Sequence, residues 1–216
     1  MSVWCRLDNL TVKELGRGHV HELSLEVNAG ELVCLHGPPG VGKSLALRAL
    51  MGFCAEAQGK IYLHDEDVSS LDHDELMRLR QTIGYSCIHA PPLSNLTVQQ
   101  NLVVPLCMNG MTFDEANERA SVVLEEFELS ENAQQRLTAL TAQKIHLLSV
   151  ARCFAMPVNY YILAEPFRAM SWAQIKLTEQ AIYRRVEDNK SILVCTDNRK
   201  FIEHEKCRVV EMPVVP

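Results

Sequence analysis

Residues 37–44 combine glycine, lysine and serine in a spacing suited to binding phosphate. They read Gly-Pro-Pro-Gly-Val-Gly-Lys-Ser, which matches the phosphate-loop pattern G-x-x-x-x-G-K-[ST]. Glycines let successive backbone N–H groups point into one concavity, the lysine reaches the β- and γ-phosphates, and the serine hydroxyl binds Mg²⁺. The predicted nucleotide-binding residues are Gly37, Pro38, Pro39, Gly40, Val41, Gly42, Lys43, Ser44 and Leu45, with Ser44 as the metal ligand.

The segments on either side of this loop have the character that phosphate binding requires. Residues 31–36 form a short apolar run typical of a strand, and residues 44–52 form a helical run that ends in glycine. A helix that begins at the loop directs its positive N-terminal end at the same concavity. The alternative of a glycine-rich turn that matches the pattern by chance is disfavoured by this strand–loop–helix order.

Bulk composition narrows the class of protein. The chain has 216 residues, 47% of them hydrophobic and 22% charged, which suits one domain with a substantial core. Its net charge of −6 argues against a nucleic-acid partner. Neither a membrane-spanning run nor a signal peptide is recognisable. The eight cysteines contain no C-x-x-C pair, so we expect free thiols in a reducing cytoplasm.

Hydrophobic patterning predicts an α/β fold with two kinds of sheet. Alternating apolar residues at 3–10 and 21–27 indicate antiparallel strands, and continuous apolar runs at 160–164 and 191–196 indicate buried parallel strands. Between positions 91 and 140 the pattern becomes helical, with an amphipathic helix at 112–127. The remaining expected elements are strands at 59–64, 83–88 and 207–212 and helices at 72–81, 147–154 and 173–187.

The order of these segments resembles the ATPase subunit of an ATP-binding-cassette (ABC) transporter. Matching stretches are Gly59–Leu63, Leu79–Tyr85, Leu96–Leu102, and Ala151-Arg152 ahead of Tyr161–Phe167. The resemblance implies a single domain, 1–216, with a P-loop NTPase core that includes an antiparallel β subdomain (1–87 and 151–216) and an inserted helical subdomain (88–150). Pro105-Leu106 and Glu165-Pro-Phe167 are most similar to small bacterial subunits of the lipid-trafficking, lipoprotein-release and cell-division types.

The resemblance implies that the family's catalytic glutamate is retained as Glu165, whereas most of the family's other polar site residues are replaced. Ala164 stands at the Mg²⁺-orienting aspartate, Ile88 at the metal-linking glutamine (with His89 one residue further) and Asp197 at the switch histidine. Leu140–Lys144 replaces the signature Leu-Ser-Gly-Gly-Gln, Ser171 replaces a loop aspartate, and the adenine-stacking aromatic falls at Glu14 or Leu15.

These replacements predict slow or absent hydrolysis. Losing one preorganised electrostatic partner costs about 10²–10³ in rate, so two losses would bring a turnover of about 10 s⁻¹ to roughly 10⁻³ s⁻¹ or below. Ground-state binding depends on the loop, Lys43 and the helix, which are present. We therefore predict ATP binding with weakened Mg²⁺ binding. The competing interpretation is that the loop serves only the fold.

The resemblance also implies partners and a location. It predicts docking through the helical subdomain on a membrane-embedded permease, pairing with an ABC ATPase as a homo- or heterodimer, and a cytoplasmic position at the inner face of the membrane. Two alternatives stay open from the sequence: a fully active ABC ATPase with a rewired site, in which His89 is the candidate replacement, and a different P-loop protein, either an AAA+-type ATPase or a kinase.

Overall fold

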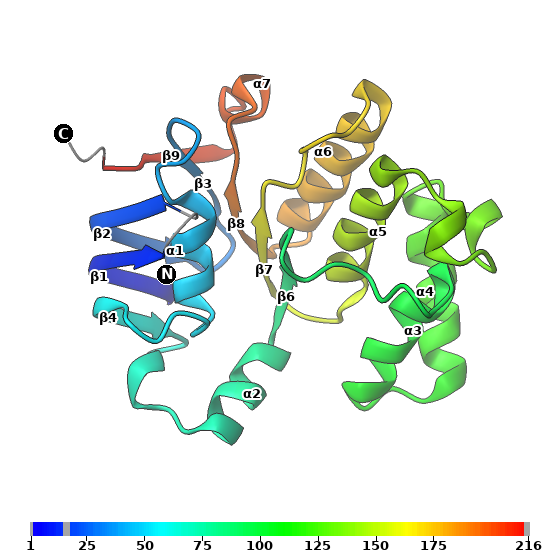
Figure 1. Ribbon diagram of the computed structural model, residues 1–216, viewed down its shortest axis with the longest axis horizontal. Coiled ribbons are helices and arrows are strands. Elements are labelled where there is room, and N and C mark those ends of the chain that lie inside the picture. The colour runs from blue at the N-terminus through cyan, green and yellow to red at the C-terminus, as the bar shows by residue number, and fades with distance from the viewer. Residues whose placement is uncertain (1, 15–17, 214–216) are drawn as a thin grey trace.

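A computed structural model describes residues 2–14 and 18–213, which form two sheets and the helices that flank them (Figure 1). The first sheet is antiparallel in the order β2-β1-β4-β5, and the second is parallel in the order β6-β7-β8-β3-β9. The α/β fold predicted from the sequence is confirmed.

The antiparallel sheet is built on one long hairpin. Strands β1 (Val3–Glu14) and β2 (Gly18–Asn28) pair along most of their length, and β1 also pairs with β4 (Gln58–Leu63). Strand β5 (Glu66–Asp67) adds a short edge. Both long strands extend beyond the ranges expected at 3–10 and 21–27, and register shifts in β1 allow it to continue as far as Glu14.

The parallel sheet consists of short strands, and its central ones are buried. Its members are β3 (Leu32–His36), β6 (Ile83–Ser86), β7 (Tyr160–Ala164), β8 (Ser191–Cys195) and β9 (Cys207–Glu211). Strand β8 lies between β7 and β3. Because parallel strands end at the same edge, the chain that leaves β3 meets the chain that leaves β7 and β8 there. Strand β6 ends at Ser86, two residues before the expected Ile88.

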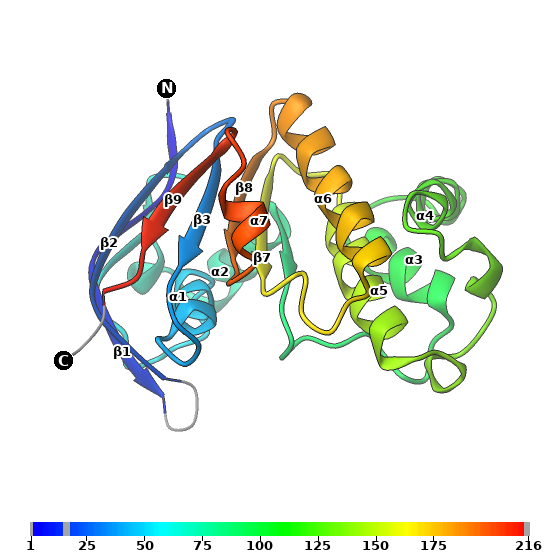
Figure 2. The same ribbon diagram turned by 90° about the horizontal axis from the view of Figure 1, so that it is seen from above.

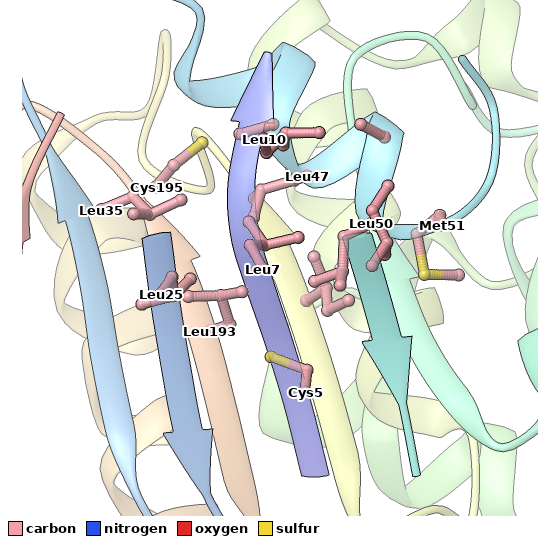
Figure 3. Packing of buried hydrophobic residues seen from close by; sticks show 14 of the residues in the cluster. Cys5, Leu7, Leu10, Leu25, Leu35, Leu47, Leu50, Met51, Leu193 and Cys195 are labelled. Carbon is pink, nitrogen blue, oxygen red and sulfur yellow. The ribbon is translucent and has the colours of Figure 1, made fainter. Parts of the chain in front are cut away.

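Helix α1 (Lys43–Leu50) lies between the two sheets and packs against both. Figure 3 shows Leu7 of β1, Leu47 and Leu50 of α1 and Leu193 of β8 among the side chains that fill this space. All four side chains are fully buried. Burying a leucine contributes about 1.5–3 kcal/mol relative to exposure, so this core fixes the start of α1, and with it the phosphate loop, against the sheet.

The opposite face of the parallel sheet carries the other large helices (Figure 2). Helix α5 (Ala142–Ala155) and helix α6 (Trp172–Glu187) lie nearest the sheet, and α3 (Val98–Met108) and α4 (Phe113–Glu126) lie beyond α5. Two further helices are α2 (His73–Gln81) and α7 (Arg199–Ile202), and 3₁₀ turns occupy Val68–Ser70, Ser130–Asn132 and Leu137–Ala139. Within the described residues, none of the helices is both long and apolar enough to cross a bilayer.

Helix α5 begins five residues before the expected start at Leu147. The Thr141 hydroxyl accepts a hydrogen bond from the Lys144 N–H at 3.3 Å and caps the helix. Its first turn contains exposed, polar residues, so hydrophobic periodicity does not detect it. The expected start was therefore wrong, and residues 142–146, none of them buried, belong to the helix.

Candidate nucleotide-binding site

The phosphate loop joins β3 to α1 in a conformation that only glycine adopts freely. Gly40 has a φ of 83° and Gly42 a φ of 95°, both in the left-handed region. A Cβ on Gly42 would lie 2.8 Å from Cγ2 of Val20, so β2 presses directly on the loop. No larger residue fits there, and the loop and the start of α1 are held in the arrangement that the sequence predicts.

Lys43 is 5% exposed, and its ammonium group lies inside the loop. It donates to the Gly37 carbonyl at 2.8 Å and to the Pro38 carbonyl at 3.3 Å. Its Nζ also lies 3.6 Å from Oε1 of Glu165. The structure therefore brings together the predicted phosphate-binding lysine and the predicted catalytic glutamate, which are far apart in the sequence.

Glu165 follows β7 in a left-handed conformation with a φ of 53°, which is uncommon for a residue with a side chain. Two hydrogen bonds fix this backbone: the Glu165 N–H donates to the Cys195 carbonyl at 2.9 Å, and His146 Nε2 donates to the Glu165 carbonyl at 3.2 Å. Burial lowers the pKa of His146, which favours a neutral imidazole. The backbone is thus set so that the carboxyl group points towards Lys43.

A second carboxyl group, that of Asp197, lies within hydrogen-bonding reach of Glu165. Burial together with Asp197 raises the pKa of Glu165 to about 7, although Lys43 acts in the opposite direction. Two carboxylates this close resist simultaneous ionisation. At neutral pH Glu165 is therefore part-protonated, and a group with such a pKa can accept a proton from water.

Ser44 shares its cavity with the carboxyl groups of Glu165 and Asp197, which are of the kind that Mg²⁺ prefers, but its nearest neighbours at the ends of β7 and β8 carry no oxygen in their side chains. The Ser44 hydroxyl lies 3.8 Å from the Cys195 sulfur. Ala164 ends β7 with a buried methyl group, and Ile88 is an exposed apolar side chain. In the described part of the chain, no three His, Cys, Asp or Glu side chains are grouped to hold a metal. The phosphate loop fits a nucleotide, whose Mg²⁺ the Ser44 hydroxyl would bind.

A cavity of about 620 Å³ opens beside the loop. It is lined by Pro39, Gly40, Gly42, Lys43, Ser44, Glu165, Phe167, Arg168, Ile175, Thr196, Asp197 and Asn198. Its far wall comes from the segments after β7 and β8. Local sequence pattern does not mark Phe167, Arg168, Ile175, Thr196 and Asn198 as cavity residues, because their place depends on the strand order.

Other predicted positions lie apart from this cavity. Residues 140–144 lead into α5 and form its first residues, where the Lys144 ammonium donates to Oδ1 of Asn132 at 2.8 Å. Glu14, a candidate for the adenine-contacting position, lies 3.7 Å from Nε of Arg48, and Leu15 is outside the described residues. Among the described residues, neither segment nor Ile88 lines the cavity.

Comparison with known proteins settles the family. The model of the ABC transporter family matches residues 20–168, which include the phosphate loop and Glu165. This chain belongs to the ABC transporter family. The alternatives of an AAA+-type ATPase and a P-loop kinase are therefore wrong.

Relatives within the ABC family share both sequence and fold with the chain. LptB of Haemophilus influenzae, a lipopolysaccharide export system ATP-binding protein, is 32% identical over 161 residues, or 74% of this chain and 66% of LptB. An uncharacterized ABC transporter ATP-binding protein of Mycobacterium tuberculosis is 27% identical over 95% of this chain and 64% of its own length. The chain thus spans just under two thirds of the length of both relatives.

Solved structures confirm the fold. The ATP-binding cassette MJ0796, solved as a dimer bound to ADP and Pi, superposes with a TM-score of 0.86 at 24% identity, over 96% of this chain and 94% of MJ0796. This ABC fold combines a parallel sheet, an antiparallel sheet and a group of helices, as the sequence predicts.

Proposed function

We propose that this chain is a nucleotide-binding subunit of an ABC-transporter-type complex that hydrolyses ATP slowly or not at all. The observation that carries the proposal is the end of β7, where Ala164 replaces a carboxylate while Glu165 faces Lys43 and Asp197. The loop keeps its backbone donors and its lysine, so phosphate binding is supported. Phosphoryl transfer also depends on orienting the metal and stabilising charge. The residues at the end of β7 do not support those two roles.

Phosphate release by the purified protein tests this proposal. We expect fluorescent ATP to bind, and phosphate release to be no faster than that of Lys43→Ala, which removes the loop cation. Turnover above about 0.1 s⁻¹ that Lys43→Ala abolishes would contradict the proposal, because typical enzymes turn over at about 10 s⁻¹. Absence of nucleotide binding would instead support a loop that serves only the fold.

One observation favours a fully active ATPase as the second candidate. The pKa of Glu165, about 7, is well suited to a general base near neutral pH. In that case other side chains would replace the missing groups, and His89, one residue beyond the metal-linking position at Ile88, is the candidate. A robust turnover in the assay above would favour this alternative.

We further propose that residues 88–150 form the helical subdomain and dock on a membrane-embedded permease, at the cytoplasmic face of the membrane. Exposed apolar side chains support a docking role: Ile88 and Leu93 before α3, and Met108 and Phe113 at the turn between α3 and α4. Phe113 is 68% exposed and Met108 78%. The family's mode of working supports pairing with an ABC ATPase, as a homo- or heterodimer.

The docking proposal can be tested by fractionating cells that express the chain with its native membrane proteins. Each large apolar side chain buried at an interface contributes about 1.5–3 kcal/mol. We therefore expect the double variant Met108→Ser/Phe113→Ser to lower the membrane-bound fraction about tenfold or more. Val209→Ser, on the edge strand β9, is the matched control. Equal loss in both variants would contradict docking through α3 and α4.

A further inference from the structure

The ammonium group of Lys43 is already surrounded by oxygen atoms of the protein. Two are backbone carbonyls of the loop, at 2.8 and 3.3 Å, and the third is Oε1 of Glu165, at 3.6 Å. In a phosphate loop, backbone N–H groups hold the inner phosphates and the lysine reaches the β- and γ-phosphates. A third phosphate would therefore approach Lys43 from the side where the Glu165 carboxyl group lies.

Asp197 adds a second carboxyl group to this side of the cavity. It lies within hydrogen-bonding reach of Glu165, and both residues line the cavity with Lys43 and Ser44. Asp197 lies two residues beyond the end of β8, the strand between β7 and β3, and so lies at the same edge of the sheet as Glu165 and the loop. Negative charge from the protein thus stands where the outermost phosphate would place its own.

We propose that the site prefers a nucleoside diphosphate to a triphosphate, because Glu165 and Asp197 take the place of the third phosphate beside Lys43. This inference rests on the proposed nucleotide-binding function. The diphosphate uses the loop amides and the start of α1, which no carboxylate blocks. The triphosphate brings one more negative charge and must displace Glu165 from Lys43.

The positive charges on the cavity wall do not cancel the repulsion between a third phosphate and the two carboxyl groups. Of the residues that line the cavity in the described part of the chain, Lys43 and Arg168 are the cationic ones. The Arg168 side chain is exposed, so water and salt screen its charge. Asp197 is also exposed, which limits the size of the effect. One unit charge about 4 Å away in a water-like medium changes affinity by about fivefold.

Competition titrations with a fluorescent adenine nucleotide test the preference. Dissociation constants of ADP and of the non-hydrolysable triphosphate adenylyl imidodiphosphate would be measured in EDTA at pH 8. We expect the protein to bind ADP about fivefold or more tightly than the triphosphate. Asp197→Asn and Glu165→Gln should each bring that ratio close to one.

Asp188→Asn is the matched control, because it removes one exposed carboxylate at the opposite end of α6. It should leave the ratio unchanged. Equal or tighter binding of the triphosphate by the unaltered protein would overturn the preference while leaving nucleotide binding intact. The preference would also be overturned if neither Asp197→Asn nor Glu165→Gln changed the ratio. Binding of neither nucleotide would overturn the proposed function and this inference together.

Discussion

The carboxyl group of Glu165 lies between a contact that suits phosphate binding and neighbours that do not suit hydrolysis under the proposed function. Its backbone is held by the Cys195 carbonyl and His146, and its side chain contacts Lys43. The neighbouring Ala164 has only a methyl side chain, and Asp197 has a carboxyl group at the position that the sequence resemblance predicts for a histidine. Under the proposed function, the site holds phosphate groups but stabilises poorly the charge that develops during hydrolysis.

Protonation of Glu165 should make stability depend on pH in a predictable direction. The pKa rises from an ordinary 4.5 to about 7, so the folded protein binds this proton more tightly than the unfolded chain. Ionisation therefore costs stability as pH rises from 4.5, and the cost is complete above 7. We expect Glu165→Gln to be about 1–3 kcal/mol more stable than the unaltered protein at pH 8, with the gain vanishing below pH 4.5.

Urea unfolding across this pH range measures the difference, and Glu205→Gln, an exposed carboxylate on the loop after α7, is the control. A gain that is the same at pH 5 and pH 8 would show that the charge of Glu165 is not its source. A loss of stability in Glu165→Gln at pH 8 would contradict the inference that ionising Glu165 destabilises the folded protein.

Among the elements, helix α5 shows how a local cap sets a boundary that hydrophobic patterning misses. Thr141 Oγ1 accepts from the Lys144 N–H at 3.3 Å, and a cap of this kind is worth about 1 kcal/mol. Thr141→Ala should lower the free energy of unfolding by about that amount. Thr141→Ser, which keeps the hydroxyl, should change it little. Equal losses in both variants, measured by thermal unfolding, would argue against the cap.

Sequence patterns predict elements well where burial alone determines them. Strand β7 occupies residues 160–164 as expected, because five largely apolar residues leave little choice of boundary. The contact of Asp197 with Glu165 was not predictable in the same way. It depends on β8 lying beside β7 and on the left-handed turn at Glu165, and neither strand order nor such a turn follows from local pattern. The predicted boundaries of the helical subdomain, 88 and 150, stay a prediction.

Over the whole molecule, two hydrophobic cores position the site and the helices around it. One joins the antiparallel sheet, α1 and one face of the parallel sheet, and it holds the loop. The other joins the opposite face to α3, α4, α5 and α6, and it carries the exposed apolar residues of the proposed docking region. The parallel sheet and α5 would thus lie between a nucleotide beside α1 and a permease against α3 and α4.

Restoring the missing carboxylate tests the central claim most directly. Phosphate release would be compared for the unaltered protein, Ala164→Asp and the uncharged control Ala164→Asn, with nucleotide titrations confirming that each variant is folded. One restored electrostatic partner is worth up to about 10²–10³ in rate, and other defects remain. We expect at least a tenfold gain in Ala164→Asp and none in Ala164→Asn. Rapid turnover by the unaltered protein, left unchanged by Ala164→Asp, would contradict it.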